Sequence, residues 1–453
     1  MSNERISQLV EEKREYYTGI SRQIWENPEQ GYQEFKFSEI LIEALRENGF
    51  EVETGLAGIP TAFQGTYGSG KPVIGFLGEY DALAGLSQKA GQTEHHPLVE
   101  GGSGHGCGHN ALGTCALAAA VTVKRMLEES HLSGTVIFYG CPAEEQGCGK
   151  SFMTRAGIFD DTDIALAPHP MDYNMIIGKS MLANIQAEFS FTGTAAHAAN
   201  APDRGRSALG AADLMIVGTQ FLREHIIQEA RLHHAYLDAG GSSPNVVQAS
   251  ARLLFFIRAP RAQQAKDIFE RVKDVARGAA LMTGTSVDIA VKSAMVDLLP
   301  NDVVGRLMAR SWEELGPCPY SQKALEVAAR MAPTVGNFSK EELLDTHVPG
   351  YERSPVAIAG SSDVGDVSYK VPTIMMFYTG TAKGTPPHSW QMTAQSATAL
   401  MDDGTMHAAK VLASTAMKLY REPELVAEAQ EELVRRTGGC YECLMPDDVR
   451  PEI

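Results

Sequence analysis

Apolar residues near the start of the chain recur at helical spacing. Between positions 3 and 25 they lie three or four residues apart and so share one face of a helix; they are Ile6, Leu9, Val10, Tyr17, Ile20 and Ile24. A second periodic stretch covers residues 33–47. Pro28 follows the first stretch and Gly49 the second, and both residue types are typical of helix ends. The pattern predicts two amphipathic helices.

Short, continuously apolar runs follow, and helical stretches separate them. The runs predict strands at 61–67, 73–77, 136–139, 164–167 and 373–378. Residues 110–129 are crowded with Ala and Leu on most faces, which predicts a buried helix. Apolar strands that alternate with helices are typical of a mostly parallel sheet covered on both faces. We therefore predict an α/β fold built on a large, mostly parallel sheet.

The middle of the chain has a different order of elements. Its pattern predicts strands and helices at 182–192 (strand), 205–225 (helix), 229–237 and 246–258 (strands), 262–283 (helix) and 285–292 (strand). This β-α-β-β-α-β order is the ferredoxin-like arrangement. We expect residues 181–295 to form a small domain inserted into a larger, discontinuous domain of residues 1–180 and 296–453. Residues 86–104 are expected to form a long loop and residues 437–453 an irregular tail.

The composition narrows the class of protein. The 453 residues include 39 basic and 56 acidic ones, which gives a net charge of −17, and 44% are hydrophobic. This composition is globular and excludes a disordered chain. The acidic balance argues against nucleic acid or an anionic membrane as the partner, because both attract clustered Lys and Arg. The chain has no apolar run of about 18 residues, its start does not resemble a secretory signal, and its seven scattered cysteines suit a reducing compartment. We expect a cytoplasmic location.

Polar residues gather at the ends of the predicted strands, where ligands collect in an α/β sheet. They stand at 78–83, 104–110, 141–147, 168–170 and 386–389. Cys107 and His109 lie among glycines, which allow a tight backbone that points both side chains at one centre. Thiolate and imidazole both bind borderline divalent metals. Taken singly, such a histidine is more often structural and such a cysteine is an inert core residue. Their convergence at one sheet edge favours a metal site.

The adjacent carboxylates Glu144 and Glu145 indicate what such a metal would do. Two neighbouring side chains at a strand end point to different sides, so one can bind metal while the other reaches the metal-bound water. A divalent cation lowers the pKa of that water to about 7. A nearby carboxylate can then take its proton and pass it to a leaving amine. The pair predicts a metal hydrolase that acts on an amide.

A thiol hydrolase is the alternative interpretation of the same segment. Cys107 would be the nucleophile and His109 or His105 its base. This interpretation leaves Glu145 and the histidines at the other strand ends without a purpose, so we rank it lower. The sequence contains neither G-x-S-x-G nor G-x-x-x-x-G-K-[ST], which disfavours a serine nucleophile and a P-loop. Cys440 and Cys443 form a single CxxC, whereas a structural zinc site would need a second pair.

The segments His-Gly-Cys-Gly-His-Asn at 105–110 and Cys-Pro-Ala-Glu-Glu at 141–145 resemble the M20 family of metallopeptidases and amidohydrolases. The resemblance covers almost the whole chain and implies two divalent metal ions, Mn²⁺ or Zn²⁺. It implies as ligands Cys107, His109, Glu145, His169 and His388. Glu144 would be the general base and then the acid. Many members carry a metal-binding His where this chain has Glu79. Asp81 follows two residues later, and we expect it to support the metal ligands.

The inserted segment resembles the lid and dimerisation domain of the same family. The resemblance implies that His197 assists catalysis across a dimer interface, and that Asn245 and Arg258 grip the substrate's carboxylate; His233 also stands at a matching position. A guanidinium suits a carboxylate because it binds it in a bidentate fork. The implied function is cleavage of an N-acyl amino acid such as p-aminobenzoyl-glutamate by a homodimer. Two alternatives stay open: a dipeptidase of the same fold, for example on β-alanyl dipeptides, and a subunit that is active only with a partner chain.

Overall fold

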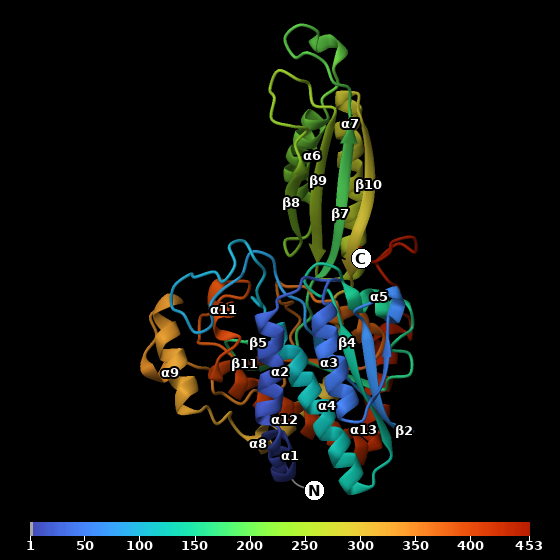
Figure 1. Ribbon diagram of the computed structural model, residues 1–453. Helices are drawn as coiled ribbons and strands as arrows, with labels where there is room; N and C mark the ends of the chain where they lie inside the picture. Colours follow the sequence, from blue (N-terminus) through green and yellow to red (C-terminus); the bar gives the residue numbers. More distant parts are fainter. Residues whose placement is uncertain (1–2) are drawn as a thin grey trace.

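The computed structural model describes residues 3–453, whose strands form two separate sheets. The larger sheet has seven strands in the order β1-β2-β4-β3-β5-β11-β6 (Figure 1). Their bounds are β1 Glu51–Thr54, β2 Phe63–Ser69, β3 Val73–Glu79, β4 Gly134–Cys141, β5 Ile164–Met171, β6 Met175–Ile176 and β11 Thr373–Thr379. The four central strands β4, β3, β5 and β11 are parallel, and the outer strands pair antiparallel. The predicted α/β fold with a mostly parallel central sheet is confirmed.

Helices cover both faces of this sheet, and the central strands β3, β4 and β11 are mostly apolar and buried along their whole length. Ile74 and Phe76 face one hydrophobic core, whereas Val73 and Leu77 face the other. The helices packed around the sheet are α1 Asn3–Glu12, α2 Arg14–Glu26, α3 Phe35–Glu47, α4 His109–Ser130, α5 Gly149–Arg155, α8 Asp302–Leu315, α9 Gln322–Met331, α10 Val364–Lys370, α11 Trp390–Gln395, α12 Ala399–Arg421 and α13 Pro423–Thr437. Of the helices described, none is both long and apolar enough to cross a membrane.

The first predicted helix is two helices in the structure. Its hydrogen-bond pattern breaks at Lys13, whose amide donates to Val10 O three residues back, at 3.3 Å, and whose backbone leaves the helical region. The apolar positions nevertheless face one core on both sides of the break. The long loop expected at 86–104 is present between β3 and α4, and the chain after α13 is irregular.

A second unit projects from the larger one (Figure 1). Its elements are β7 Ala183–Thr192, α6 Ala208–Leu222, β8 Arg231–Asp238, β9 Ser250–Ala259, α7 Ala262–Thr283 and β10 Ser286–Met295. The four strands pair antiparallel in the order β10-β7-β9-β8. Inward residues such as Phe189 and Phe255 alternate with more exposed ones and pack against Met215 of α6 and Val272 of α7. The opposite face of this sheet is therefore left open to the larger unit and to solvent.

A buried histidine far from the strand ends makes acid stability testable. His407 on α12 lies beside Trp312 and is 5% exposed, and burial, aided by the nearby Lys410 ammonium, lowers its pKa to about 4. Above pH 6.5 the imidazole is neutral in both states. Between pH 6.5 and 4 only the unfolded chain takes up this proton, so native stability falls as pH falls. We expect this histidine to cost about 3 kcal/mol of unfolding free energy by pH 4.

The measurement is urea unfolding followed by tryptophan fluorescence at pH 7, 5.5 and 4. The stability of wild type should fall more steeply with acidification than that of His407→Gln, which has no titrating group there. Parallel pH slopes for the two proteins would show that His407 is protonated in the native state.

Candidate active site

The segments that carry the predicted ligands meet at the carboxyl ends of the central strands. His109 is the first residue of α4, and Gly108 before it has a φ of 76°. A side chain at Gly108 would press on Pro170 and Met392, so only glycine allows this turn to approach so closely. His388 also has a positive φ, of 56°, and its amide donates to Gly106 O at 2.8 Å. The loop after β11 is thereby fastened to the loop before α4.

The five predicted ligands lie together in two overlapping groups. Cys107 belongs to both: one group adds His109 and His169, and the other adds Glu145 and His388. Cys107 Sγ is 3.4 Å from His169 Nε2, and Glu145 Oε2 is 3.3 Å from His388 Nε2. Donor atoms that bind one tetrahedral ion at about 2.0–2.3 Å are about 3.3–3.6 Å apart. The residues present therefore fit divalent metal ions, and Cys107 would be available to both groups.

Hydrogen bonds fix the orientation of these side chains. Asp81 Oδ1 pairs with His109 Nδ1 at 2.8 Å, and Asp81 Oδ2 accepts from the Glu145 amide at 2.9 Å. His169 Nδ1 lies 2.9 Å from Pro170 O. In both histidines the Nδ1 contact leaves Nε2 free as the donor to a metal, which is the usual arrangement around metal-binding histidines. Asp81 thus links two of the candidate ligands from behind.

The electrostatics of the site suit a cation. His109 Nε2 and Glu145 Oε1 are buried and have no hydrogen-bond partner among the described residues, a state that costs free energy unless a ligand satisfies it. Burial and the neighbouring His109 lower the pKa of His169 to about 4, which keeps its imidazole neutral. Burial and Glu145 raise the pKa of Cys107 well above its usual range. The thiolate is the form of cysteine that acts as a nucleophile and also the form that binds metal, so Cys107 needs a nearby cation to reach it.

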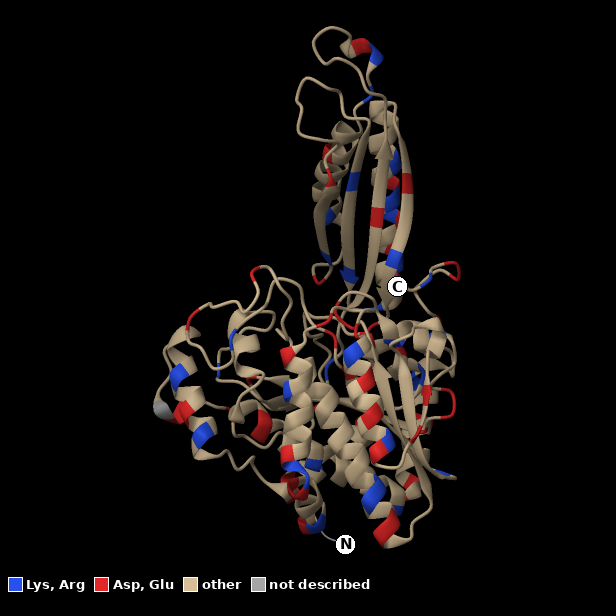
Figure 2. Ribbon diagram, in the orientation of Figure 1, with Lys and Arg blue, Asp and Glu red and all other residues tan. Residues whose placement is uncertain are grey.

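A cleft between the two units passes over these residues. It encloses about 1390 Å³ of space that is partly open to solvent. Figure 2 shows that acidic residues occur in the loops where the projecting unit meets the larger one. Glu144 is half-buried in the wall of the cleft, and Arg258 of β9 and Asn184 of β7 line it from the projecting unit. Arg258 Nε and Asn184 Oδ1 are buried without partners within the described chain.

Apolar side chains form the rest of the cleft wall. They come from both units and are Met171, Tyr173, Met181, Phe256, Met295, Met375 and Phe377. The Arg258 guanidinium lies over the Phe256 ring, 5.3 Å from its centroid. Among the described residues, the lining of the cleft therefore offers one guanidinium, two carboxylates and an apolar surface to a bound molecule.

The structure does not bring His197 and Asn245 to this cleft. Both are exposed, in the loops 193–207 and 239–249 at the end of the projecting unit that is farthest from the seven-stranded sheet (Figure 1). These loops contact each other: the Ala198 amide donates to Asn245 O at 2.9 Å, and His197 forms a bridge with Val246. His233 is exposed on β8 opposite Phe256, and it lies beside the cleft without lining it.

Sequence reasoning missed three polar residues of this region. Asn184 carries no motif, and only its pairing with Arg258 in the sheet places it in the cleft. Lys150 forms buried ion pairs with both Glu79 and Asp363. A lysine in the first turn of a helix normally lies in solvent, so the chain itself gives little sign of this burial.

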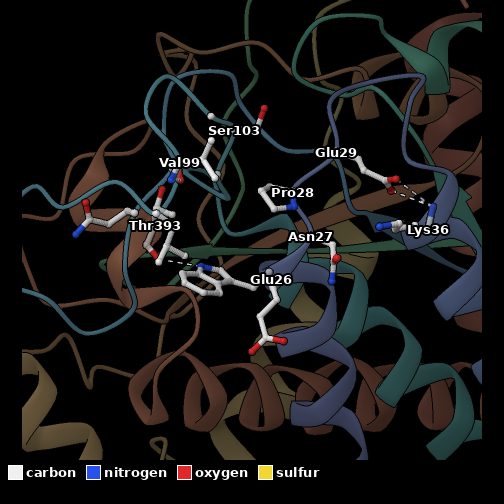
Figure 3. A pocket seen from close by; sticks show the side chains of 14 residues that line it. Glu26, Asn27, Pro28, Glu29, Lys36, Val99, Ser103 and Thr393 are labelled. Carbon is white, nitrogen blue, oxygen red and sulfur yellow. Dashed lines mark hydrogen bonds between the residues drawn. The ribbon is translucent and has the colours of Figure 1, made fainter.

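A second cavity lies beside the long loop 86–104 (Figure 3). Its polar groups already have partners: Trp25 Nε1 donates to Thr393 O at 3.0 Å, and the Glu29 carboxylate accepts from the amides of Lys36 and Phe37 at the start of α3. These bonds fasten the loop and cap the helix. The cavity is thus explained by packing around the loop.

Comparison with known proteins places this geometry in a family. The model of the peptidase family M20/M25/M40 matches residues 75–418. The chain is 43% identical to one of the subunits of p-aminobenzoyl-glutamate hydrolase from Escherichia coli (strain K12), over 98% of each chain, and 28% identical to a Xaa-Arg dipeptidase of Mus musculus, over 94% of this chain and 91% of the relative. A dinuclear metal-binding M20 peptidase of Bacillus subtilis has a similar fold, with a TM-score of 0.56 at 18% identity, over 89% of this chain and 98% of that one. The resemblance inferred from the motifs is thereby confirmed, and the chain belongs to the peptidase family M20/M25/M40.

Proposed function

We propose that this protein is a metal-dependent amidohydrolase that cleaves the amide bond of an N-acyl amino acid such as p-aminobenzoyl-glutamate. The observation that carries the proposal is the convergence in one cleft of the candidate ligands, Glu144 and Arg258. The Escherichia coli relative, a p-aminobenzoyl-glutamate hydrolase chain of matching length, supports the substrate class.

The ligands proposed for the two ions are Cys107, His109, Glu145, His169 and His388. A bound pair of divalent ions, Mn²⁺ or Zn²⁺, supplies Lewis acidity and lowers the pKa of water. The donor set of thiolate, imidazole and carboxylate suits either ion.

Glu144 is proposed as the group that moves the proton. Its side chain lies half-buried within reach of Glu79 and His109. Burial, together with the nearby Glu79 and Glu145 carboxylates, raises the pKa of Glu144 well above its usual range. A raised pKa brings a carboxyl closer to neutral pH, where it can both accept and return a proton. Glu144 would take a proton from the attacking water and donate it to the leaving amine nitrogen.

Arg258 and Asn184 are proposed to hold the carboxylate of the leaving amino acid. Both face the cleft from the projecting unit. Arg258 Nε is a buried donor without a partner among the described residues, and an asparagine side chain donates through its Nδ2. The apolar residues on the side of the larger unit, such as Tyr173 and Phe377, would pack against the acyl group. This orientation places the amide between the two units and next to Glu144.

We further propose a homodimer in which His197 and Asn245 of one copy reach the cleft of the other. Within one chain both residues lie at the far end of the projecting unit, where they have no access to Glu144. That unit offers an unpaired edge strand, β8, on which Tyr236 and Leu237 are exposed. Such an edge readily pairs with another chain. His233 on β8 would then lie near this interface and the substrate.

Replacing Arg258 tests the carboxylate assignment. We expect Arg258→Met to lower kcat/KM for p-aminobenzoyl-glutamate about 10- to 100-fold, mainly through KM, because a charge-assisted pair is lost. On the α-carboxamide analogue of the substrate, the same replacement should lower kcat/KM only a little relative to wild type. Arg252→Met is the matched control: Arg252 lies on the same strand but pairs with Glu188 on the surface. Equal losses on acid and amide would contradict the assignment.

Activity measured on a panel of substrates distinguishes the proposed function from two alternatives. The Xaa-Arg dipeptidase relative favours a dipeptidase as the second candidate. Purified chain supplied with Mn²⁺ or Zn²⁺ should hydrolyse acyl-glutamates faster than β-alanyl or Xaa-Arg dipeptides. The reverse order would favour the dipeptidase. The Escherichia coli relative is named as a subunit, so activity that appears only after addition of a partner chain would identify a two-subunit enzyme.

A further inference from the structure

Glu79 is a buried carboxylate of which one oxygen is paired with a lysine and the other has no partner among the described residues. It ends β3 and is 2% exposed. Its Oε1 lies 2.7 Å from Lys150 Nζ. Its Oε2 is buried and has no hydrogen-bond partner among the described residues. A buried carboxylate oxygen without a partner is costly, so the free oxygen needs a ligand that the chain itself does not provide.

A second ion pair holds Glu79 in place. Asp363 accepts from the Lys150 amide at 2.8 Å and from its ammonium at 2.6 Å. Lys150 and Asp363 are both fully buried. The ammonium is therefore clamped between two carboxylates, and Glu79 cannot rotate without breaking this contact. Two buried carboxylates thus share one ammonium.

The free oxygen of Glu79 points at the candidate metal site. Oε2 lies 3.4 Å from His109 Nε2, the nitrogen that Asp81 leaves free for a metal. Two donors of one tetrahedral ion are about 3.3–3.5 Å apart when each binds at about 2.0–2.2 Å. His109 Nε2 is itself a buried atom without a partner among the described residues. The two unsatisfied atoms thus have the separation of two ligands of one ion.

We propose that Glu79 is a further metal ligand, added beside His109 to the ion of Cys107, His109 and His169. The structure itself groups Glu79 with His109 and Glu144. Lys150 and Asp363 are positioning residues that aim its Oε2 at the ion. The inference rests on the proposed metal pair. It gives the first ion four protein donors, whereas the group of Cys107, Glu145 and His388 has three. Structural metal sites are typically closed by four protein ligands, and catalytic ones keep a position for water. The two groups would therefore differ in their number of protein donors.

The test compares metal binding by Glu79→Gln and wild type. Glutamine keeps the size of the side chain and an oxygen for Lys150 but removes the charged donor. After dialysis against graded concentrations of a chelator, bound Zn²⁺ is counted by plasma mass spectrometry. We expect wild type to hold two ions, and Glu79→Gln to bind one of the two about 10- to 100-fold more weakly. Lys150→Met should show a smaller loss at the same ion. Asp366→Asn is the matched control, because Asp366 is fully buried but its side chain bonds only Ser151, Tyr441 and the Val296 amide among the described residues.

Cobalt spectra separate a ligand from a merely structural residue. Co²⁺ bound to the first group should lose absorption intensity in the visible region, or shift it, in Glu79→Gln but not in Asp366→Asn, because the number or kind of donors changes. Two ions with wild-type affinity and unchanged cobalt spectra in Glu79→Gln would overturn the inference while leaving the metal pair intact. A wild type that binds no divalent ion would instead overturn the proposed function.

The variant need not fold for the inference to be tested. A crystal structure of wild type loaded with Zn²⁺ locates the ions by anomalous scattering. We expect Glu79 Oε2 within about 2.5 Å of one ion. A separation beyond about 3.5 Å, or a Glu79 carboxyl hydrogen-bonded to Glu144 in place of the metal, would overturn the assignment.

Discussion

Glu144→Gln should lose at least about 10³-fold in kcat while the purified protein keeps both metal ions. Glutamine has the size of glutamate but cannot accept a proton from water or return one to the leaving amine. Glu144 belongs to neither of the two groups that share Cys107, although it lies with Glu79 and His109 in a third group. Because Glu144 is proposed to carry the proton and not to bind metal, the metal content should stay near that of wild type. The measurement is kcat on p-aminobenzoyl-glutamate, with metal counted in the same samples.

Two controls make this result specific to proton transfer. Gln146→Ala changes an exposed side chain in the same loop and should retain most activity. Glu144→Ala should match the glutamine variant, because both remove the carboxylate. Activity that survives in either Glu144 variant would contradict the assigned role. Loss of metal together with activity would instead identify Glu144 as a ligand.

Removal of the metal should abolish activity and leave the fold intact. We expect dialysis against a strong chelator to lower kcat/KM at least about 10³-fold, since Lewis acidity contributes several kcal/mol to such reactions. The helices and sheets have their own apolar cores, so circular dichroism should change little. Mn²⁺ or Zn²⁺ should restore activity, whereas Mg²⁺ should not, because it prefers oxygen ligands over thiolate and imidazole.

The opposite outcome has a definite meaning. Full activity in protein shown to be free of metal would refute the metal mechanism and revive Cys107 as a nucleophile. Alkylation of Cys107 would then stop turnover in the metal-free protein. In the metal-loaded enzyme we expect Zn²⁺ to protect this thiol from alkylation, because a coordinated sulfur is no longer free to react.

The sequence predicted the parts of this protein that depend on local pattern. Continuous apolar runs such as 73–77 could only be buried strands, and the alternation in 183–192 marks a sheet with one covered face. The candidate ligands could be found because each follows a strand or begins a helix at the same sheet edge. The break at Lys13 could not be found, because the apolar face continues through it.

Residues whose role depends on a partner far away in the sequence could not be predicted from local pattern. Lys150 looks like an ordinary charge in the first turn of a helix until Asp363, more than 200 positions later, is brought beside it. Asn184 gains a place in the cleft only through its register opposite Arg258. Conversely, His197 and Asn245 lie far from the other candidates within one chain, because their loops are at the far end of the projecting unit.

The chain passes between the two units twice, and the two connecting segments have a consequence for turnover. They run side by side: Ser180 Oγ donates to Leu298 O at 2.7 Å, and the Leu298 amide donates to Met181 O at 3.3 Å. In the proposed orientation one end of the substrate is held by Arg258 and the other by the larger unit, so an intact substrate ties the units together across this narrow joint. Hydrolysis cuts that tie. The units are then free to separate at the moment when the two products must leave. Cleavage of the amide bond thus also permits product release.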